Sequence, residues 1–176
     1  RPSGVDGATD MLGSITNPDH VARAVDGAEG VIHLAAKVSL AGDARAFHSV
    51  NVEGTQSVLS AAEAAGVSRL VHVSSPSVAH AGSALAGVGA EPASPESARS
   101  EYARTKAKAE LLALARNCAA MRVIAIRPHL VWGPGDTQLV GRIVDRARRG
   151  RLPLLNGGTA LIDTTYIDNA ASGIVA

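Results

Sequence analysis

The chain has 176 residues, of which 46% are hydrophobic, and this is enough for one ordinary globular domain with a buried core. Its formal net charge is only +1, and the two signs are mixed along the chain, so there is no basic field for nucleic acid and no polybasic patch for a membrane surface. We therefore expect no nucleic-acid partner.

Cysteine usage and hydropathy narrow the class of protein further. The single cysteine, Cys118, cannot form an internal disulfide, and no group of Cys and His has the spacing of metal ligands. Because free cysteines are usually buried, Cys118 is predicted to be a small core residue. No apolar run is long enough to cross a bilayer, and the first residues lack the pattern of a signal peptide. These features predict a cytoplasmic protein without a metal site or a membrane segment.

Short apolar segments alternate with segments of helical periodicity. Residues 29–36 and 68–75 are β-rich and bounded by Gly or Ser, which predicts buried strands, and residues 43–66 between them show helical spacing that stops at Gly66. The alternation continues with a helix near 100–117, a strand at 121–128, a helix near 138–149, a strand near 160–167 and a helix opening at Asp168. Repeated strand and helix units predict an α/β fold with a doubly wound parallel sheet and helices on both faces.

Two stretches interrupt this alternation. Residues 79–100 are rich in Ala, Gly, Ser and Pro and are too long for a routine connection, so they form either a functional loop or a disordered one. Residues 132–138 are a turn-rich crossing directly after a strand. Both follow the carboxyl ends of strands, where open α/β sheets bind their ligands.

Tyr102 and Lys106 stand out because the chain has only two tyrosines and three lysines. Four residues apart on a helix, the two side chains share one face. An ammonium group beside a phenol lowers the pKa of the phenol, as a general acid and base for alcohol and ketone chemistry requires. An exposed helix face is the alternative, since Arg104, Lys108 and Glu110 surround the pair in sequence.

Serines at the end of the second strand are the next candidates. Ser74, Ser75 and Ser77 precede the long loop, and the tyrosine-bearing helix follows that loop back to the same sheet edge, so a hydroxyl can meet the phenol. Serines in this position are also ordinary turn formers. His33 is predicted to be a packed strand histidine rather than a catalyst, because nothing near it in sequence would orient it.

Seven segments, in order, resemble the extended short-chain dehydrogenase/reductase family, which includes the nucleotide-sugar epimerases. Within it, the chain is most similar to the 3β-hydroxysteroid dehydrogenase branch, whose bacterial members include sterol dehydrogenases and 2-alkyl-3-oxoalkanoate reductases. The segments are GSIT (13–16), GVIHLAA (30–36), NVEGTQSVLSAA (51–62), RLVHVSS (69–75), YARTK (102–106), IRPHLVWGPGD (126–136) and TTYIDNAA (164–171).

The resemblance implies catalytic roles for four residues. Tyr102 would donate or accept the proton, and Lys106 would hold the nicotinamide ribose and tune the tyrosine. Ser75 would hydrogen-bond the substrate oxygen, with Ser74 as the alternate. Asn51 matches the position that shapes the following helix and backs the active site.

The resemblance also implies a Rossmann-like domain that binds NAD or NADP. Tyr102 and Lys106 would take part in this binding. Ser14 stands where the family usually has Asp, which removes an acceptor for the adenine end. The remaining predicted cofactor contacts are Ser14, Ile15, Leu34, Ala35, Ala36, Pro128 and His129.

The family's glycine-rich phosphate loop does not occur in these residues. Residues 1–28 resemble the segment that follows the second strand of the family, and the sequence ends inside a helical pattern, so we expect a fragment that binds the dinucleotide weakly by itself. Arg1 lies near the predicted end of that second strand and slightly favours NADP(H) over NAD.

The predicted function is an NAD(P)-dependent oxidoreductase that interconverts a secondary alcohol and a ketone on an apolar 3-hydroxy or 3-oxo substrate. We expect residues 1–176 to be one partial domain, with substrate-region elements at about 79–100 and 132–160. The alternatives are a nucleotide-sugar epimerase or dehydratase with bound NAD, and a non-catalytic dinucleotide sensor. The resemblance also implies a possible homodimer through the helix that bears Tyr102.

Overall fold

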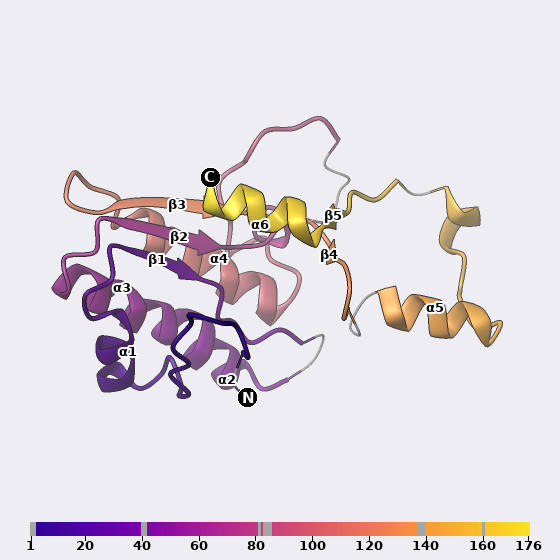
Figure 1. Ribbon diagram of the computed structural model, residues 1–176. Coiled ribbons are helices and arrows are strands. Elements are labelled where there is room, and N and C mark those ends of the chain that lie inside the picture. The colour runs from indigo at the N-terminus through magenta and orange to yellow at the C-terminus, as the bar shows by residue number, and fades with distance from the viewer. Residues whose placement is uncertain (1–2, 40–41, 81, 83–85, 137–139, 160) are drawn as a thin grey trace. The chain divides into compact units, whose positions relative to one another are not determined.

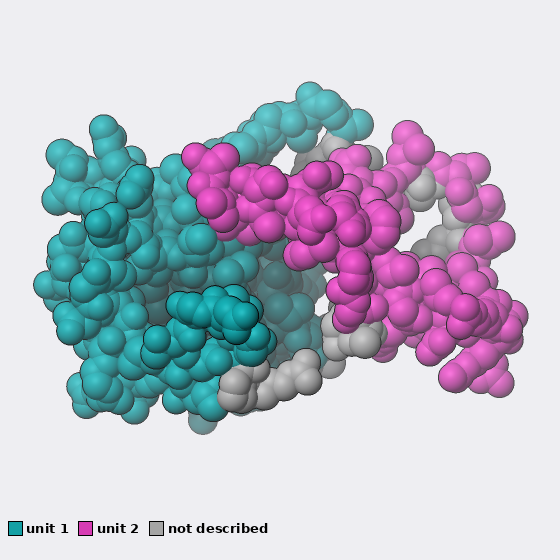
Figure 2. Space-filling view, viewed as in Figure 1, with its two compact units in different colours: residues 1–127 teal, residues 128–176 magenta. Residues whose placement is uncertain are grey.

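The structure, a computed structural model, describes residues 3–39, 42–80, 82, 86–136, 140–159 and 161–176. It divides into two compact units, residues 1–127 and residues 128–176, which are coloured separately in Figure 2 and which we describe one at a time. Arg1, on which the prediction of NADP(H) rather than NAD is based, lies outside the described residues. So does part of the long loop, at residues 81 and 83–85.

The first unit is built on a parallel sheet of three strands, β1 (Gly30–His33), β2 (Arg69–Val73) and β3 (Arg122–Ile126), in the order β1-β2-β3 (Figure 1). The three strands predicted in this part of the chain are therefore confirmed, each shorter than its apolar run. Val31 pairs with Leu70, which pairs with Val123, so one face of the sheet presents an aliphatic row.

The first unit contains the short segments α2 (Ala44–His48), the π-helical turn η1 (Ser49–Glu53) and the 3-10 helix η2 (Pro76–Val78). Three longer helices, α1 (Pro18–Val25), α3 (Gly54–Ala64) and α4 (Glu101–Leu114), bury side chains against the aliphatic face of the sheet. The core that they form with the sheet centres on Leu59, Leu70 and Val123, and each such buried side chain contributes about 1.5–3 kcal/mol. Ile32 and Ile124, on the opposite face, are exposed. The sequence predicts helices on both faces of the sheet, and within the described first unit they cover one face.

Two helix ends show how local sequence sets these elements. At the start of α1, the Asn17 side chain accepts a hydrogen bond from the His20 N–H at 3.1 Å, and Pro18 occupies the first helical position. The Asn-Pro signal is present in the sequence, but we did not predict a helix from it. After α3, Gly66 takes a φ of +72°, which ends the helix as predicted.

The prediction that Cys118 is buried is wrong. The residue lies in the turn between α4 and β3 and is exposed. Its backbone N–H donates to the carbonyl of Met121 at 3.0 Å, and the Asn117 side chain accepts from the N–H of Val123 at 3.0 Å. Connecting turns run over the surface, where water reaches the backbone groups that have no internal partner, and Cys118 is exposed with its turn. Met121, 2% exposed, supplies the core side chain here instead.

The second unit contains β4 (Val131–Trp132), α5 (Val140–Arg148), the short 3-10 helix η3 (Leu155–Gly158), β5 (Thr165–Tyr166) and α6 (Ile167–Val175). Strands β4 and β5 pair in parallel, and the rings of Trp132 and Tyr166 meet edge to face at 5.2 Å. The last two predicted helices are confirmed, whereas the strand predicted near 160–167 is reduced to two residues. None of the helices in the described part of the chain is long and apolar enough to span a membrane.

Candidate active site

Ser75 and Tyr102 meet at the end of β2. Ser75 is extended and caps η2, where its hydroxyl accepts a hydrogen bond from the N–H of Ser77 at 3.3 Å. Tyr102 lies in the first turn of α4, which Ser100 caps by accepting from the N–H of Ala103 at 3.1 Å. The Ser75 hydroxyl lies 3.0 Å from that of Ser77 and near enough to Tyr102 that hydrogen bonding lowers the pKa of the phenol. The structure thus brings together the two groups that the sequence placed at one sheet edge.

Ser74, the alternate to Ser75, has a different environment. Its side chain is 7% exposed, and its hydroxyl has no hydrogen-bond partner within the described residues. The geometry therefore favours Ser75 as the hydroxyl that works with Tyr102.

Lys106 is buried beneath the same edge. The residue is 3% exposed, and its ammonium nitrogen Nζ donates to the backbone carbonyl of Val73 at 2.7 Å. Burial lowers the pKa of Lys106 to about 8, and the charge of Glu110, one helical turn later, opposes that shift. Glu110 itself is 1% exposed. The alternative, a solvated helix face, is therefore wrong for Lys106 and for Glu110.

The expected electrostatic effect of Lys106 on Tyr102 is not found. The pKa of Tyr102 is raised above its usual value, first by burial, and the hydrogen bond with Ser75 offsets this only in part. The Lys106 ammonium points to the Val73 carbonyl at the end of β2. The prediction that Lys106 lowers the pKa of Tyr102 is thus wrong for the chain as described, because desolvation of the phenol is the dominant effect.

Asn51 joins the site to the segment after β1. It lies in η1, an insertion of the π type that is often found at functional sites, and it is 1% exposed. Its amide oxygen accepts from the N–H of Lys37 at 2.7 Å, and its amide nitrogen donates to the Lys37 carbonyl at 3.2 Å and to the Thr105 hydroxyl at 3.0 Å. Asn51 therefore holds that segment against the helix of Tyr102. Thr105 was not among the predicted site residues, although it directly precedes Lys106.

Two histidines are packed behind Asn51. His33 Nε2 lies 2.9 Å from the Thr55 hydroxyl, which in turn donates to the Asn51 carbonyl at 2.7 Å. The rings of His33 and His72 are 5.4 Å apart. Burial, followed by the charge of Lys106, lowers the pKa of His33 to about 4 and that of His72 to about 3, so both are neutral near pH 7. The prediction of His33 as a packed strand residue is confirmed.

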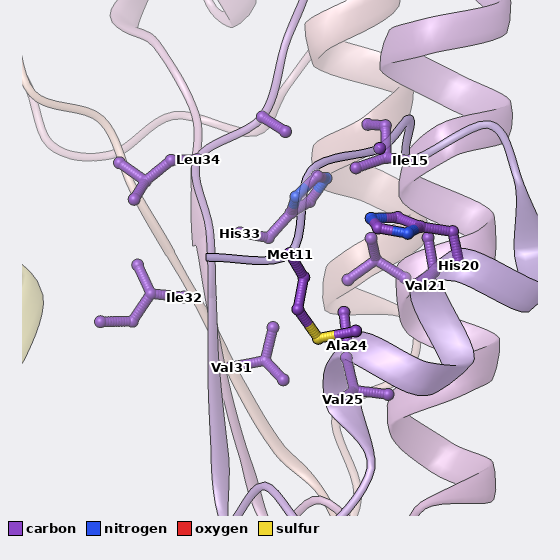
Figure 3. Close-up of a pocket in the computed structure, with 13 residues that line it drawn as sticks. Met11, Ile15, His20, Val21, Ala24, Val25, Val31, Ile32, His33 and Leu34 are labelled. Carbon is purple, nitrogen blue, oxygen red and sulfur yellow. The ribbon is translucent and has the colours of Figure 1, made fainter. Parts of the chain in front are cut away.

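A pocket of about 330 Å³ lies between β1 and α1 (Figure 3). Three of the predicted cofactor contacts, Ile15, Leu34 and Ala35, line it. Its other lining residues are Met11, Gly13, His20, Val21, Ala24, Val25, Val31, Ile32, His33 and Val58. Small and aliphatic walls with two histidines among them suit a flat aromatic ring such as adenine.

The other predicted cofactor contacts lie elsewhere. Ser14 and Ala36 neighbour pocket residues in the chain but do not line the pocket, and the Ser14 hydroxyl lies 2.8 Å from that of Thr16. Pro128 and His129 are half-buried and begin the second unit. Within the described residues, no group of three or more His, Cys, Asp or Glu has the arrangement of a metal site.

A buried ion pair near Lys106 was also not predicted from the sequence. Arg127, directly after β3, donates through Nε to Glu110 at 2.9 Å and through Nη2 to the other carboxylate oxygen. Its Nη1 donates to the carbonyl of Glu91 in the long loop at 2.7 Å. The available signal was the spacing of Glu110, four residues beyond Lys106 and so on the same helix face.

Comparison with known proteins identifies the family. Residues 3–176 match the 3-beta hydroxysteroid dehydrogenase/isomerase family. The chain belongs to this family. It is 45% identical over 167 residues to a 2-alkyl-3-oxoalkanoate reductase of Stenotrophomonas maltophilia, covering 94% of this chain and 51% of that protein. It is 35% identical over 175 residues to a 3 beta-hydroxysteroid dehydrogenase/Delta 5-->4-isomerase of Mycobacterium tuberculosis, with coverage of 94% and 47%. The chain thus spans about half the length of these relatives.

Solved structures agree with this assignment. MoeE5 in complex with UDP-glucuronic acid and NAD matches 99% of this chain and 60% of its own, with a TM-score of 0.81 and 31% identity. DesIV, a dTDP-glucose 4,6-dehydratase of Streptomyces venezuelae, matches 92% of this chain and 52% of its own, with a TM-score of 0.76 and 31% identity. The predicted α/β dinucleotide-binding fold and the predicted family are therefore confirmed.

Proposed function

We propose that the chain carries the proton-transfer site of an NAD(P)-dependent oxidoreductase, which interconverts a secondary alcohol and a ketone on an apolar 3-hydroxy or 3-oxo substrate. The observation that carries this proposal is the placement of Ser75 and Tyr102 at the end of β2, with Lys106 buried one helical turn further along α4 and bonded to the Val73 carbonyl. A strand-end hydroxyl, a phenol and an ammonium group at one sheet edge match the needs of carbonyl reduction.

Each side chain has a distinct part in the proposed reaction. In the reducing direction, Ser75 donates a hydrogen bond to the substrate carbonyl oxygen, and Tyr102 transfers its phenolic proton to that oxygen. The raised pKa of Tyr102 keeps the phenol protonated and ready to donate. Lys106 holds the hydroxyls of the nicotinamide ribose of the cofactor. Asn51 fixes the helix that carries Tyr102 and Lys106, through its hydrogen bond to Thr105.

The cofactor of the proposed reaction is NAD or NADP. When bound, the dinucleotide supplies the hydride in the reducing direction and accepts it in the oxidising direction. Ile15, Leu34 and Ala35 line the slot for its adenine end, and no bulky polar group among them blocks the approach. Ser14, Ala36, Pro128 and His129 remain proposed contacts on the basis of the family resemblance.

The names of the relatives support the proposed substrate class. Two of them, from Stenotrophomonas maltophilia and Shewanella oneidensis, are 2-alkyl-3-oxoalkanoate reductases, and others are named 3β-hydroxysteroid dehydrogenases. In both classes a hydroxyl or keto group at position 3 is attached to a large apolar body. We assign recognition of that body to residues 79–100 and 132–160.

A second candidate is a nucleotide-sugar epimerase or dehydratase with bound NAD. Solved structures similar to this chain favour it, since they are in complex with UDP-glucuronic acid or are named dTDP-glucose 4,6-dehydratase. The same Ser, Tyr and Lys would serve in either enzyme. A non-catalytic sensor is less well supported, because nothing would then select a buried lysine one helical turn from a tyrosine at the end of β2.

The test is a comparison of substrates on the intact protein and on its Tyr102→Phe variant. We expect NAD(P)H consumption with 2-alkyl-3-oxo acids or 3-oxosteroids, no turnover of UDP- or dTDP-sugars, and at least a roughly 100-fold loss in kcat for Tyr102→Phe. Turnover of nucleotide sugars alone would select the second candidate. Unchanged activity of the Tyr102→Phe variant would reject the catalytic site altogether.

A further inference from the structure

The ion pair between Glu110 and Arg127 is more buried than the other ion pairs found in the described part of the first unit. The side chain of Glu110 is 1% exposed and that of Arg127 is 17% exposed. Two guanidinium nitrogens of Arg127 contact the two carboxylate oxygens. Removing such charges from water costs several kcal/mol, and apolar residues of similar size are often at least as stable, so stability alone does not explain the pair.

The pair ties α4 to the sheet close to the proposed site. Lys106 and Glu110 are four residues apart on one face of α4. Lys106 bonds to the Val73 carbonyl at the end of β2, and Glu110 bonds to Arg127 just beyond the end of β3. The two strand ends are themselves joined, since the N–H of Ser74 donates to the Ile126 carbonyl at 2.7 Å. Two adjacent turns of α4 are thus anchored to two adjacent strands.

The same arginine holds the returning arm of the long loop, residues 90–99. Arg127 donates to the Glu91 carbonyl at 2.7 Å. Further along the arm, the N–H of Ser94 donates to the Val78 carbonyl at 2.8 Å, and Ala93 packs with Val78 and Ala107. This arm connects the strand that bears Ser75 to the helix that bears Tyr102. Its position therefore affects how the two hydroxyls meet.

The charge of Glu110 also acts on Lys106. Burial lowers the pKa of Lys106 to about 8, and Glu110 opposes this. The other titratable groups around the lysine are Tyr102 on its own helix and His33 and His72 on the strands. The Lys106 charge lowers the pKa values of both histidines. Among these groups, Glu110 is the one whose charge favours the protonated form of Lys106.

We propose that Glu110 and Arg127 are positioning residues for the reaction: Glu110 anchors the turn of α4 that follows Lys106 to the end of β3, and Arg127 holds both Glu110 and the returning arm of the loop. Neither residue touches the substrate in this scheme. The inference rests on the proposed function, because the role of Lys106 in that reaction gives the pair its purpose.

The test is the pH profile of kcat/KM for the intact protein and its Glu110→Gln variant. Loss of the carboxylate moves the alkaline limb set by Lys106 to lower pH by about one unit, since the charge of Glu110 opposes the lowering of the Lys106 pKa by burial. The matched control is Glu63→Gln, which removes the carboxylate of an exposed pair with Arg116 between α3 and the end of α4. Its profile remains that of the parent protein.

The double variant Glu110→Gln/Arg127→Met separates positioning from structure and covers the case in which Glu110→Gln alone does not fold. A neutral, well-packed pair is expected to restore stability. The double variant does not return the alkaline limb of the pH profile to its position in the parent protein. Its KM rises because the loop arm has lost its bond to Arg127. If the profile of the double variant equals that of the parent, the inference is wrong, while an inactive Tyr102→Phe variant would still uphold the proposed function. If Tyr102→Phe is fully active, the proposed function fails as well.

Discussion

The two buried histidines make the fold sensitive to acid. His33 is 5% exposed and His72 is not exposed at all. Both are neutral in the folded chain at about pH 5, since burial holds the pKa of His33 at about 4 and that of His72 at about 3. In the unfolded chain, each has an ordinary pKa near about 6.5 and takes up a proton as the pH falls. The unfolded state therefore binds more protons, and stability falls between about pH 6.5 and the folded pKa values.

The size of the effect follows from these values. At about pH 5, a histidine with an unfolded pKa of about 6.5 is about 97% protonated when unfolded, and linkage gives a loss of about 2 kcal/mol for each residue relative to about pH 7.5. The two residues together account for about 4 kcal/mol, which is a large part of the usual stability of a domain. The loss grows further as the pH falls to about 4.

The measurement is the free energy of unfolding in urea at about pH 7.5 and about pH 5 for the intact protein and for His72→Leu. Both ring nitrogens of His72 are without a hydrogen-bond partner in the described residues, so leucine removes no bond and fills a similar volume. We expect the variant to lose about 2 kcal/mol less than the parent between the two pH values. His80→Gln, which replaces an exposed histidine, serves as the control and should keep the parent's pH dependence.

An acid loss in His72→Leu as large as in the parent protein would refute this reasoning. It would mean that His72 titrates in the folded chain as it does in the unfolded one. The burial of the pair beside Lys106 would then not have the electrostatic effect that we assign to it.

Three further predictions concern the site and its support. Asn51→Leu should lower kcat at least about 10-fold while the core stays folded, because the bond to Thr105 is lost; steady-state kinetics with circular dichroism checks this. Gly54→Ala should destabilise the protein by about 1–3 kcal/mol in urea unfolding, because a Cβ there would lie 2.6 Å from Ile15 Cδ1. The activity of the intact protein should fall above about pH 8 as Lys106 loses its proton, and Lys106→Met should remove this limb from the pH profile of kcat/KM.

Much of the fold was predictable because its signals are local. The apolar strands, the helix ending at Gly66 and the α/β alternation all follow from residues close together in the chain. The pairing of Ser75 with Tyr102 was also predictable, since strand ends and helix starts of a parallel sheet meet at one edge. Asn17 and Pro18 carried a further local signal, the start of α1, from which no helix was predicted.

The charges were harder to predict because their partners are distant in sequence. Arg127 and Glu110 are separated by 17 positions, and the one local signal, that Glu110 shares the helix face of Lys106, does not show which cation it pairs with. The direction of the Tyr102 pKa shift is set first by burial of the phenol, and the Lys106 ammonium bonds to a backbone carbonyl of β2. Neither follows from the spacing of the two side chains. The spacing of two residues along a helix shows whether their side chains lie on the same face, but not which atoms those side chains contact.

The position of the Lys106 ammonium explains how a buried lysine keeps the charge that the proposed reaction needs. A lysine that is 3% exposed would lose its charge near neutral pH without a compensating group, and the Val73 carbonyl and the Glu110 carboxylate provide that compensation. Glu110 is in turn paired with Arg127, just beyond the end of β3, so the acid on α4 is not an isolated buried charge. A tyrosine with a raised pKa next to a lysine that remains charged is suited to give up its proton only when a substrate oxygen becomes basic, which is the moment at which carbonyl reduction requires it.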